Sequence, residues 1–572
     1  MDLCDVALPY TLIGVLLWPP PRHPGAVACA GRFLRDYASR ATNALLWIAL
    51  ISVTTVLFRR LARLVRLWVQ GSRIPGPPST PFLALIHGCG SLGNLSGYLS
   101  DLHEKYGPIV RLWLSPTQLL VSVRDTRLIK EMLIKADDKL PLTGRAFHLA
   151  FGKSSLFISS FHKVQKRRES LAEYMNRRLS ARTNFITSKV VEFVIDRVDT
   201  IMAAGLLDCI QISRQLAFFV LGSTFFGDAF LDWPNASIYE ELLMTIAKDG
   251  CFWASYSVPP FWSREYWKYQ YMCNRLRHLT QDMIQYCVDK YDSLSQTDHR
   301  SYRENKDIAK EARLDASVLL DNMRSGGLFL EEMEKYFISE DEPCGNILGS
   351  MFHGCLAFAS LISSILTRLV MHPDLQEKLY LEIVAVQEET SKLDLHDVEK
   401  MNLLMATIYE SARLLPAGPL LQRCSLKHDI CLSSGVTVPV GAILVVPLQL
   451  VQTDNSIWGK DASQFNPYRF LSEGKECIGI CNEHEGPEKN SSLSELNENA
   501  AFLTFGYGTR ACVGKKFAIL GVSALIAALL QNYEVQIRFQ PGLDDDPKPI
   551  LNDCVLKLLP SPKISFTKRS QR

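Results

Sequence analysis

A glycine-rich segment around one cysteine constrains the fold of this chain more than any other feature. From Phe502 to Ala518 the sequence reads FLTFGYGTRACVGKKFA, and an apolar, helix-like run follows. The segment sets five residues in the order F-x-x-G-x-R-x-C-x-G, namely Phe505, Gly508, Arg510, Cys512 and Gly514. Glycines permit a tight loop, and a helix N-terminus stabilises a negative sulfur. The pattern predicts that Cys512 is a metal-ligating thiolate, and a cysteine buried for packing is the alternative.

Two further motifs accompany the cysteine segment, and the set resembles the cytochrome P450 family. Glu410 and Arg413 form E-x-x-R, whose (i, i+3) spacing sets both side chains on one helix face. Arg469 falls where that family places the second arginine of a buried Glu-Arg-Arg cluster that braces the haem loop. Each charge in such a cluster must be paired, because an unpaired buried charge costs on the order of 3 to 5 kcal/mol. The resemblance covers about Ile74 to Thr567.

The resemblance implies a mainly α-helical fold with small β-sheets, in which residues 79–567 are the haem-thiolate catalytic domain and residues 568–572 a tail. It implies haem b (iron protoporphyrin IX), with Cys512 as the axial ligand of the iron. His162 stands where the family has a propionate-binding tryptophan. The other cofactor-binding residues that it implies are Phe505, Gly508, Arg510, Gly514, Arg423, Lys166 and Arg167. For the last three, an ordinary surface charge is the alternative.

Local patterns also indicate a mainly helical body. Short β-branched runs after turn signals predict strands at 109–114 and 119–123, and the run 436–450 is strand-like or extended. Helical periodicity covers 167–204, 264–291, 345–372 and 374–389. Two polar stretches, 292–315 and 472–499, are typical of surface insertions.

The helix that ends before His372 departs from the family pattern. Family members carry A/G-G-x-D/E-T where this helix crosses the distal face of the haem, and the aligned residues here are Gly354, Leu356 and Ala357. An acid beside an alcohol relays protons during oxygen activation, which leucine and alanine cannot do. The substitutes that stay open are ordered water, a substrate hydroxyl, Ser360, His353 and Cys355, of which the last two also fit helix packing.

Three functions follow from these residues. The first is a membrane-bound haem-thiolate monooxygenase, which inserts one oxygen atom from O2 into a small hydrophobic substrate with NADPH-derived electrons. The second is a haem-thiolate isomerase or dehydratase acting on a hydroperoxide, which needs no proton relay and is favoured by Leu356 and Ala357. The third is a non-catalytic haem-binding protein.

The segment from Ala41 to Phe58 carries no charge and predicts a transmembrane anchor, since a helix of this length rises roughly 27 Å. Arginines follow it at positions 59, 60, 63, 66 and 73, which favours a single pass with the catalytic domain in the cytosol, most simply at the endoplasmic reticulum. Residues 1–40 are then luminal and 59–78 a basic, Pro-rich hinge. A buried helix is the alternative to the anchor. For the earlier apolar stretch from Val6 to Trp18, the alternative is a signal peptide cleaved near Ala28-Cys29-Ala30.

Composition limits the partners. The chain has 62 Lys and Arg against 60 Asp and Glu, so its net charge of +2 does not favour nucleic acid. A basic patch is expected to dock an NADPH-dependent flavoprotein reductase, and its members are Lys163, Lys166, Arg167, Arg168, Lys515 and Lys516. An aromatic-rich segment, 252–271, predicts either a second contact with membrane lipid or core packing.

Overall fold

A computed structural model describes the ranges 24–78, 95–136, 207–249, 261–298, 342–388, 395–471, 502–537, 548–552 and 555–569. It also describes residue 138 and scattered positions between 156 and 196. His162, Lys163 and most of the predicted insertions lie outside these residues. The chain divides into two units, Met1–Gln70 and Gly71–Arg572, which are considered separately.

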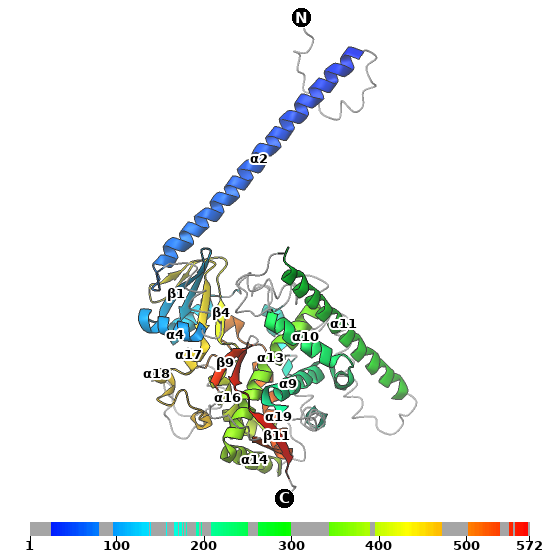
Figure 1. The fold of residues 1–572 in the computed structure, drawn as a ribbon, viewed down its shortest axis with the longest axis vertical. Coiled ribbons are helices and arrows are strands. Elements are labelled where there is room, and N and C mark those ends of the chain that lie inside the picture. Colours follow the sequence, from blue (N-terminus) through cyan, green and yellow to red (C-terminus); the bar gives the residue numbers. More distant parts are fainter. Residues whose placement is uncertain are drawn as a thin grey trace. The chain divides into compact units, whose positions relative to one another are not determined.

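The first unit consists largely of one long helix, α2 (Pro24–Ser72), drawn in blue in Figure 1. It is longer than the predicted anchor, and it includes residues 59–72 of the predicted hinge, because no proline interrupts the helix before Pro75. From Tyr37 to Leu61 its apolar side chains are exposed, with Trp47 at 64% and Phe58 at 73% of their full accessibility. A stretch of this apolar character, Tyr37–Ser72, is long enough to cross a membrane, and none of its most apolar window is buried.

The second unit is mainly helical, as predicted, and its core lies among four helices, α9 (Cys209–Phe226), α13 (Glu342–Met371), α16 (Asn402–Leu414) and α19 (Lys515–Asn532). Helices α9 and α13 run antiparallel, since Leu221 lies against Gly354 and Cys209 lies 3.7 Å from the carbonyl oxygen of Ser363. Phe358 of α13 packs on Phe517 of α19 at a ring distance of 5.6 Å. These contacts make α13 the central element, held between α9 and α19.

Further helices surround this core. They are α4 (Leu95–Tyr106), α5 (Thr126–Lys135), α10 (Ala236–Asp249), α11 (Arg264–Asp298), α14 (Pro373–Glu388), α15 (Leu395–Lys400), α17 (Leu448–Gln452) and α18 (Asn455–Trp458). Three short 3-10 segments, η3 (Asp228–Asp232), η5 (Pro467–Phe470) and η7 (Gly508–Arg510), complete them. The predicted helices 264–291, 345–372 and 374–389 correspond to α11, α13 and α14, and α11 extends into the predicted insertion because its helical pattern continues to Asp298.

The main sheet has the strand order β1-β2-β7-β4. The hairpin of β1 (Ile109–Ser115) and β2 (Gln118–Val123) is antiparallel, β2 pairs in parallel with β7 (Ile443–Pro447), and β7 pairs antiparallel with β4 (Leu420–Arg423). The strands expected at 109–114 and 119–123 are confirmed, whereas the extended run at 436–450 ends early, because α17 begins at Leu448. In the register of this sheet, Arg423 stands opposite Leu444 at the end of β4.

Three small sheets lie elsewhere in the described ranges. One joins β3 (Leu207–Asp208), β11 (Lys563–Lys568) and β8 (Tyr533–Ile537), and the others are the hairpins β9–β10 (Lys548–Asn552, Val555–Leu559) and β5–β6 (Ile430–Cys431, Thr437–Val438). The predicted class, mainly α with small β-sheets, is therefore the class observed.

Candidate active site

The loop before α19 presents Cys512 to solvent. Backbone hydrogen bonds close the loop, from the amide of Cys512 to the carbonyl oxygen of Phe505 at 2.7 Å and from the amide of Gly506 to that of Leu503 at 2.8 Å. Gly506 and Gly508 have φ values of 74° and 70°, a region that favours glycine. A Cβ atom on Gly508 would also lie 3.2 Å from the carbonyl oxygen of Leu133. The sequence thus forms a tight turn that leaves the thiol accessible.

Cys512 differs from most other described cysteines, which are buried, namely Cys209, Cys273, Cys287, Cys355 and Cys424. Burial raises the pKa of Cys209 to about 11 and that of Cys273 to about 12, so these thiols stay protonated. Cys431 is also exposed, but it lies on the two-residue strand β5 beside Thr437. Among these residues, only Cys512 combines exposure with a helix N-terminus.

Two cations lie near the thiol. Lys515, the first residue of α19, places its ammonium 5.8 Å from the ring centre of Phe505. Burial lowers the pKa of Lys515, and the charge of Cys512 opposes this shift. Arg168 donates from Nη2 to the carbonyl oxygen of Ala511 at 2.8 Å. Burial lowers the pKa of Arg168, and the charge of Cys512 opposes this shift as well. A negative sulfur is therefore compensated by positive charge on its protein side.

Several arginines near the loop are buried. Arg423 donates to the carbonyl oxygen of Arg510 at 3.2 Å, and both side chains are at most 5% exposed. Arg167 is 1% exposed. The alternative of an ordinary surface charge is therefore wrong for Arg423 and Arg167, whereas Lys166 is exposed. Arg167 and Arg168 were also expected in a basic surface patch, and burial removes both from it.

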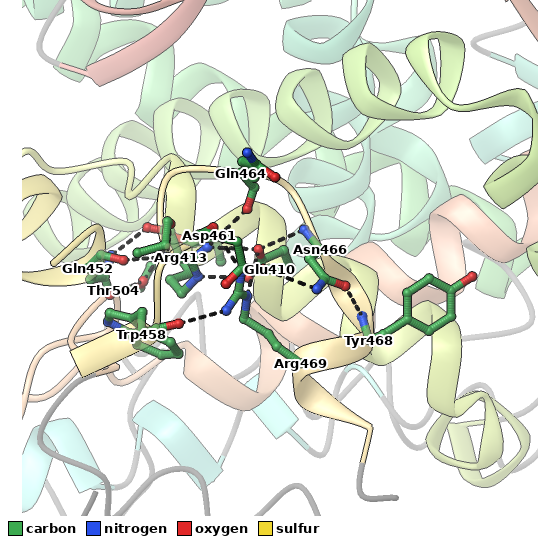
Figure 2. A network of polar contacts seen from close by, with 12 residues as sticks. Glu410, Arg413, Gln452, Trp458, Asp461, Gln464, Asn466, Tyr468, Arg469 and Thr504 are labelled. Carbon is green, nitrogen blue, oxygen red and sulfur yellow. Dashed lines mark hydrogen bonds and ion pairs between the residues drawn. The ribbon is translucent and has the colours of Figure 1, made fainter. Parts of the chain in front are cut away.

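The Glu-Arg-Arg cluster is assembled from α16 and η5 (Figure 2). Both oxygens of Glu410 accept from Arg413, at 2.7 and 2.8 Å, and one also accepts from Nε of Arg469 at 3.0 Å and from the amide of Asn466 at 2.9 Å. Glu410 and Arg413 are fully buried. Arg469 further reaches Asp461, at 2.9 Å. Each buried charge is thus paired and hydrogen-bonded, which is the condition for its stability.

This cluster continues to the cysteine loop through residues that the sequence did not reveal. Arg413 donates to the carbonyl oxygen of Gln452, and the Gln452 side chain donates back to that of Arg413 at 2.8 Å. Oε1 of Gln452 accepts from the amide of Leu503 at 3.1 Å and from Thr504 at 2.8 Å, and both groups lie at the start of the loop (Figure 2). No local motif marks Gln452 or Thr504, because their partners are distant in sequence.

Helix α13 carries the residues that depart from the family pattern. Leu356 is buried and lines a small pocket with Arg214 of α9, Ser360 of α13 and Lys557 of β10. Ala357 and Gly354 are half-buried. Two basic residues, Arg214 and Lys557, therefore line the same pocket as Leu356, which stands at the position where the family pattern has an acid.

The surroundings of Cys512 fit a haem with one thiolate ligand. Within the described ranges no three His, Cys, Asp or Glu side chains lie close enough together to hold a metal ion, so a metal at Cys512 needs further donors, which a porphyrin supplies. The buried guanidinium groups of Arg423 and Arg510 are charged donors of the kind that bind haem propionates. The class that these features define is that of a haem-thiolate protein. The features are the accessible thiol, the glycine turn and the buried arginines.

Comparison with known proteins agrees with this class. The family model "Cytochrome P450" matches residues 74–566, and the chain therefore belongs to the cytochrome P450 family, whose members are haem-thiolate monooxygenases. It is 22% identical over 524 residues to the probable cytochrome P450 313a5 of Drosophila melanogaster, covering 88% of this chain and 95% of that protein. It is 24% identical over 509 residues to cytochrome P450 3A2 of Rattus norvegicus, covering 86% and 90%. The chain is thus an oxidoreductase, and the non-catalytic alternative is not supported.

Proposed function

We propose that this protein is a membrane-bound monooxygenase that inserts one oxygen atom from O2 into a small hydrophobic substrate, with electrons that reach it from NADPH through a flavoprotein reductase. The observation that carries the proposal is the exposed Cys512 on a loop that hydrogen bonds connect to the Glu410–Arg413–Arg469 cluster. Haem b, when bound, supplies the oxygen chemistry. The protein then has to bind it, keep the sulfur charged and hold its propionates.

The residues divide this work. Cys512 binds the iron, and its negative charge is favoured by α19 and by Lys515 and Arg168. Arg423, Arg510 and Arg167, all buried, hold the propionates. Gln452 and Thr504 fix the start of the loop, so that the position of the thiol does not depend on the cofactor alone.

Membrane attachment is proposed through α2 as a single pass, with the second unit in the cytosol at the endoplasmic reticulum. Three other helices of the described residues are long and apolar enough to span, but 78% of each apolar window is buried, whereas none of that in α2 is. A second contact is proposed at the start of α11, where Phe261, Trp262, Trp267 and Tyr271 are all exposed. Aromatic side chains of this kind favour the headgroup level.

The reductase-docking surface is smaller than the sequence indicated. With Arg167 and Arg168 buried, the exposed members in the described residues are Lys166 and Lys516, and Lys516 already lies 3.7 Å from Glu399. Lys515 is half-buried against Phe505. Docking by this surface therefore depends on few charges, and we expect its rate to depend only weakly on salt.

A second function, rearrangement of a hydroperoxide, is favoured by one observation. The acid position of α13 is Leu356 and the alcohol position is Ala357, so the usual proton relay is missing, and a rearrangement needs neither this relay nor a reductase.

A carbon monoxide spectrum of the ferrous full-length protein in membranes separates the two functions. We expect the long-wavelength thiolate band after reduction by NADPH and reductase, and Cys512→Ala should abolish it because the iron loses its sulfur ligand. Cys431→Ser, at the other exposed cysteine among the described residues, should leave the band unchanged. A band that forms only with dithionite would favour the rearrangement, and a band that survives Cys512→Ala would refute the assignment of the ligand.

A further inference from the structure

One face of α13, called the open face below, is half-buried where the rest of the helix is buried, and it carries a histidine. Between Gly345 and Thr367 every residue is buried except Ser350, His353, Gly354 and Ala357, which are half-buried. Successive members are at most four residues apart, so the four share one helix face. His353 and Ala357, at i and i+4, are neighbours on it. The alcohol position of the family pattern therefore lies one turn from an imidazole.

The surroundings of the other polar residues of this helix make them poorer proton donors than His353. These residues are Cys355, Ser360 and Ser350. Cys355 is buried, and burial raises the pKa of its thiol strongly, so it does not donate a proton to an open face readily. Ser360 is 2% exposed and lines the pocket behind Leu356. Ser350 donates its hydroxyl proton to the carbonyl oxygen of Asn346 at 2.9 Å. On this face, His353 is the titratable side chain.

We propose that His353 is the proton-donating residue of the distal face, in place of the acid and alcohol that Leu356 and Ala357 lack. The inference rests on the proposed haem-thiolate function, in which α13 crosses the distal side of the cofactor. With haem bound, the imidazolium of His353 would give up one proton on that side of the cofactor and would be reprotonated from solvent. Histidine suits this exchange, because its ordinary pKa lies close to neutrality.

The charged groups nearest to this part of α13 lie on its neighbours. Arg214 of α9 is paired with Glu240 of α10 at 3.2 Å, and Lys557 of β10 is buried in the same pocket behind Leu356. Arg214 and Lys557 line this pocket together with Leu356, and none of these charged groups belongs to the half-buried face that carries His353.

The test is the infrared C–O stretch of the ferrous carbon monoxide complex of the full-length protein. An N–H donor on the distal face polarises bound CO and lowers this frequency, so His353→Phe should raise it. His353→Gln keeps an N–H donor and should retain part of the lowering, whereas Ser350→Ala, on the same face one turn earlier, should match the wild type. In parallel, His353→Phe should lower product formation by about 10²-fold and divert NADPH consumption to hydrogen peroxide.

Three results would overturn the proposal. Equal frequencies in wild type and His353→Phe would show that the imidazole does not reach the ligand. A resting ferric spectrum with nitrogen and sulfur ligands, lost in His353→Phe, would make His353 an iron ligand instead of a proton donor. Absence of the thiolate band from every variant, the wild type included, would refute the proposed function itself, whereas a normal band without a frequency shift refutes only the role of His353.

Discussion

The proximal loop and the distal helix differ in how polar groups are supplied. Around Cys512 the structure holds a connected set of buried charges and hydrogen bonds, from Glu410 through Gln452 to Thr504. Along α13, the positions that usually carry an acid and an alcohol are apolar, and the basic groups behind Leu356 face a pocket. The loop around Cys512 therefore carries the polar groups that the family pattern requires there. Helix α13 lacks the acid and the alcohol, so proton delivery on that side depends on groups outside the family pattern.

This difference indicates which requirement is strict. A thiolate ligand must be fixed in place and compensated by positive charge, and few arrangements do this. Proton delivery has several chemical routes, since water, a substrate or a histidine can each take part. A chain can thus keep every proximal feature and change the distal helix, and the two regions should respond differently to substitution.

The largest effect is expected on the proximal side, from Glu410→Gln. The substitution leaves the fully buried Arg413 without its counter-charge, and breaking a buried pair costs about 3 to 5 kcal/mol. We expect the full-length protein in detergent to unfold at a lower denaturant concentration and to lose its thiolate band in parallel. Glu399→Gln, at the exposed contact with Lys516, is the control and should change stability by less than about 1 kcal/mol. A stable Glu410→Gln variant with a normal band would break the comparison, because the cluster would then not brace the loop.

The distal side should be open to reconstruction. Leu356→Asp with Ala357→Thr restores an acid and an alcohol, and the new carboxylate would face Arg214 and Lys557 in the pocket. In the His353→Phe background we expect this pair to recover product formation by about 10 to 100-fold, measured as product per NADPH consumed. Leu356→Asn with Ala357→Val keeps similar volumes without the relay and should recover nothing. Equal recovery by both pairs would mean that packing, and not proton transfer, limits the distal side.

The two regions also differ in how far the sequence could predict them. The E-x-x-R spacing predicts Glu410 and Arg413 on one helix face, and the family resemblance predicts Arg469 as their partner, as the contacts show. Gln452 and Thr504 could not be found, because a single glutamine or threonine has no local signal and their partners come from other elements. Arg167 and Arg168 were placed wrongly on the surface, because a run of basic residues does not show which of them the fold buries.

On the distal helix the sequence identified the departure but could not choose the substitute. Helical spacing placed His353 and Cys355 near the relay position, yet spacing alone does not show which face of the helix is covered. Packing against α9 and α19 settles this, since it buries Cys355 and leaves His353 on the open face. The helix that contains the predicted anchor likewise extends beyond the uncharged segment, because charged residues can continue a helix and no proline follows until Pro75.

The smallest expected effect is a shift of the haem midpoint potential on the proximal side. It concerns Lys515 and Lys516, the two lysines that begin α19. A positive charge at a helix N-terminus is unfavourable, but Lys515 is half-buried beside Cys512, whereas Lys516 is exposed. A cation near the ligand favours the added electron, so Lys515→Met should disfavour reduction by about tenfold, a midpoint potential about 59 mV lower for one electron. Lys516→Met should shift the potential by less than a third of this, because solvent screens its charge. Spectroelectrochemical titration of the full-length holoprotein measures both, and equal shifts would show that net charge alone, and not the position of Lys515 against the thiolate, sets the potential.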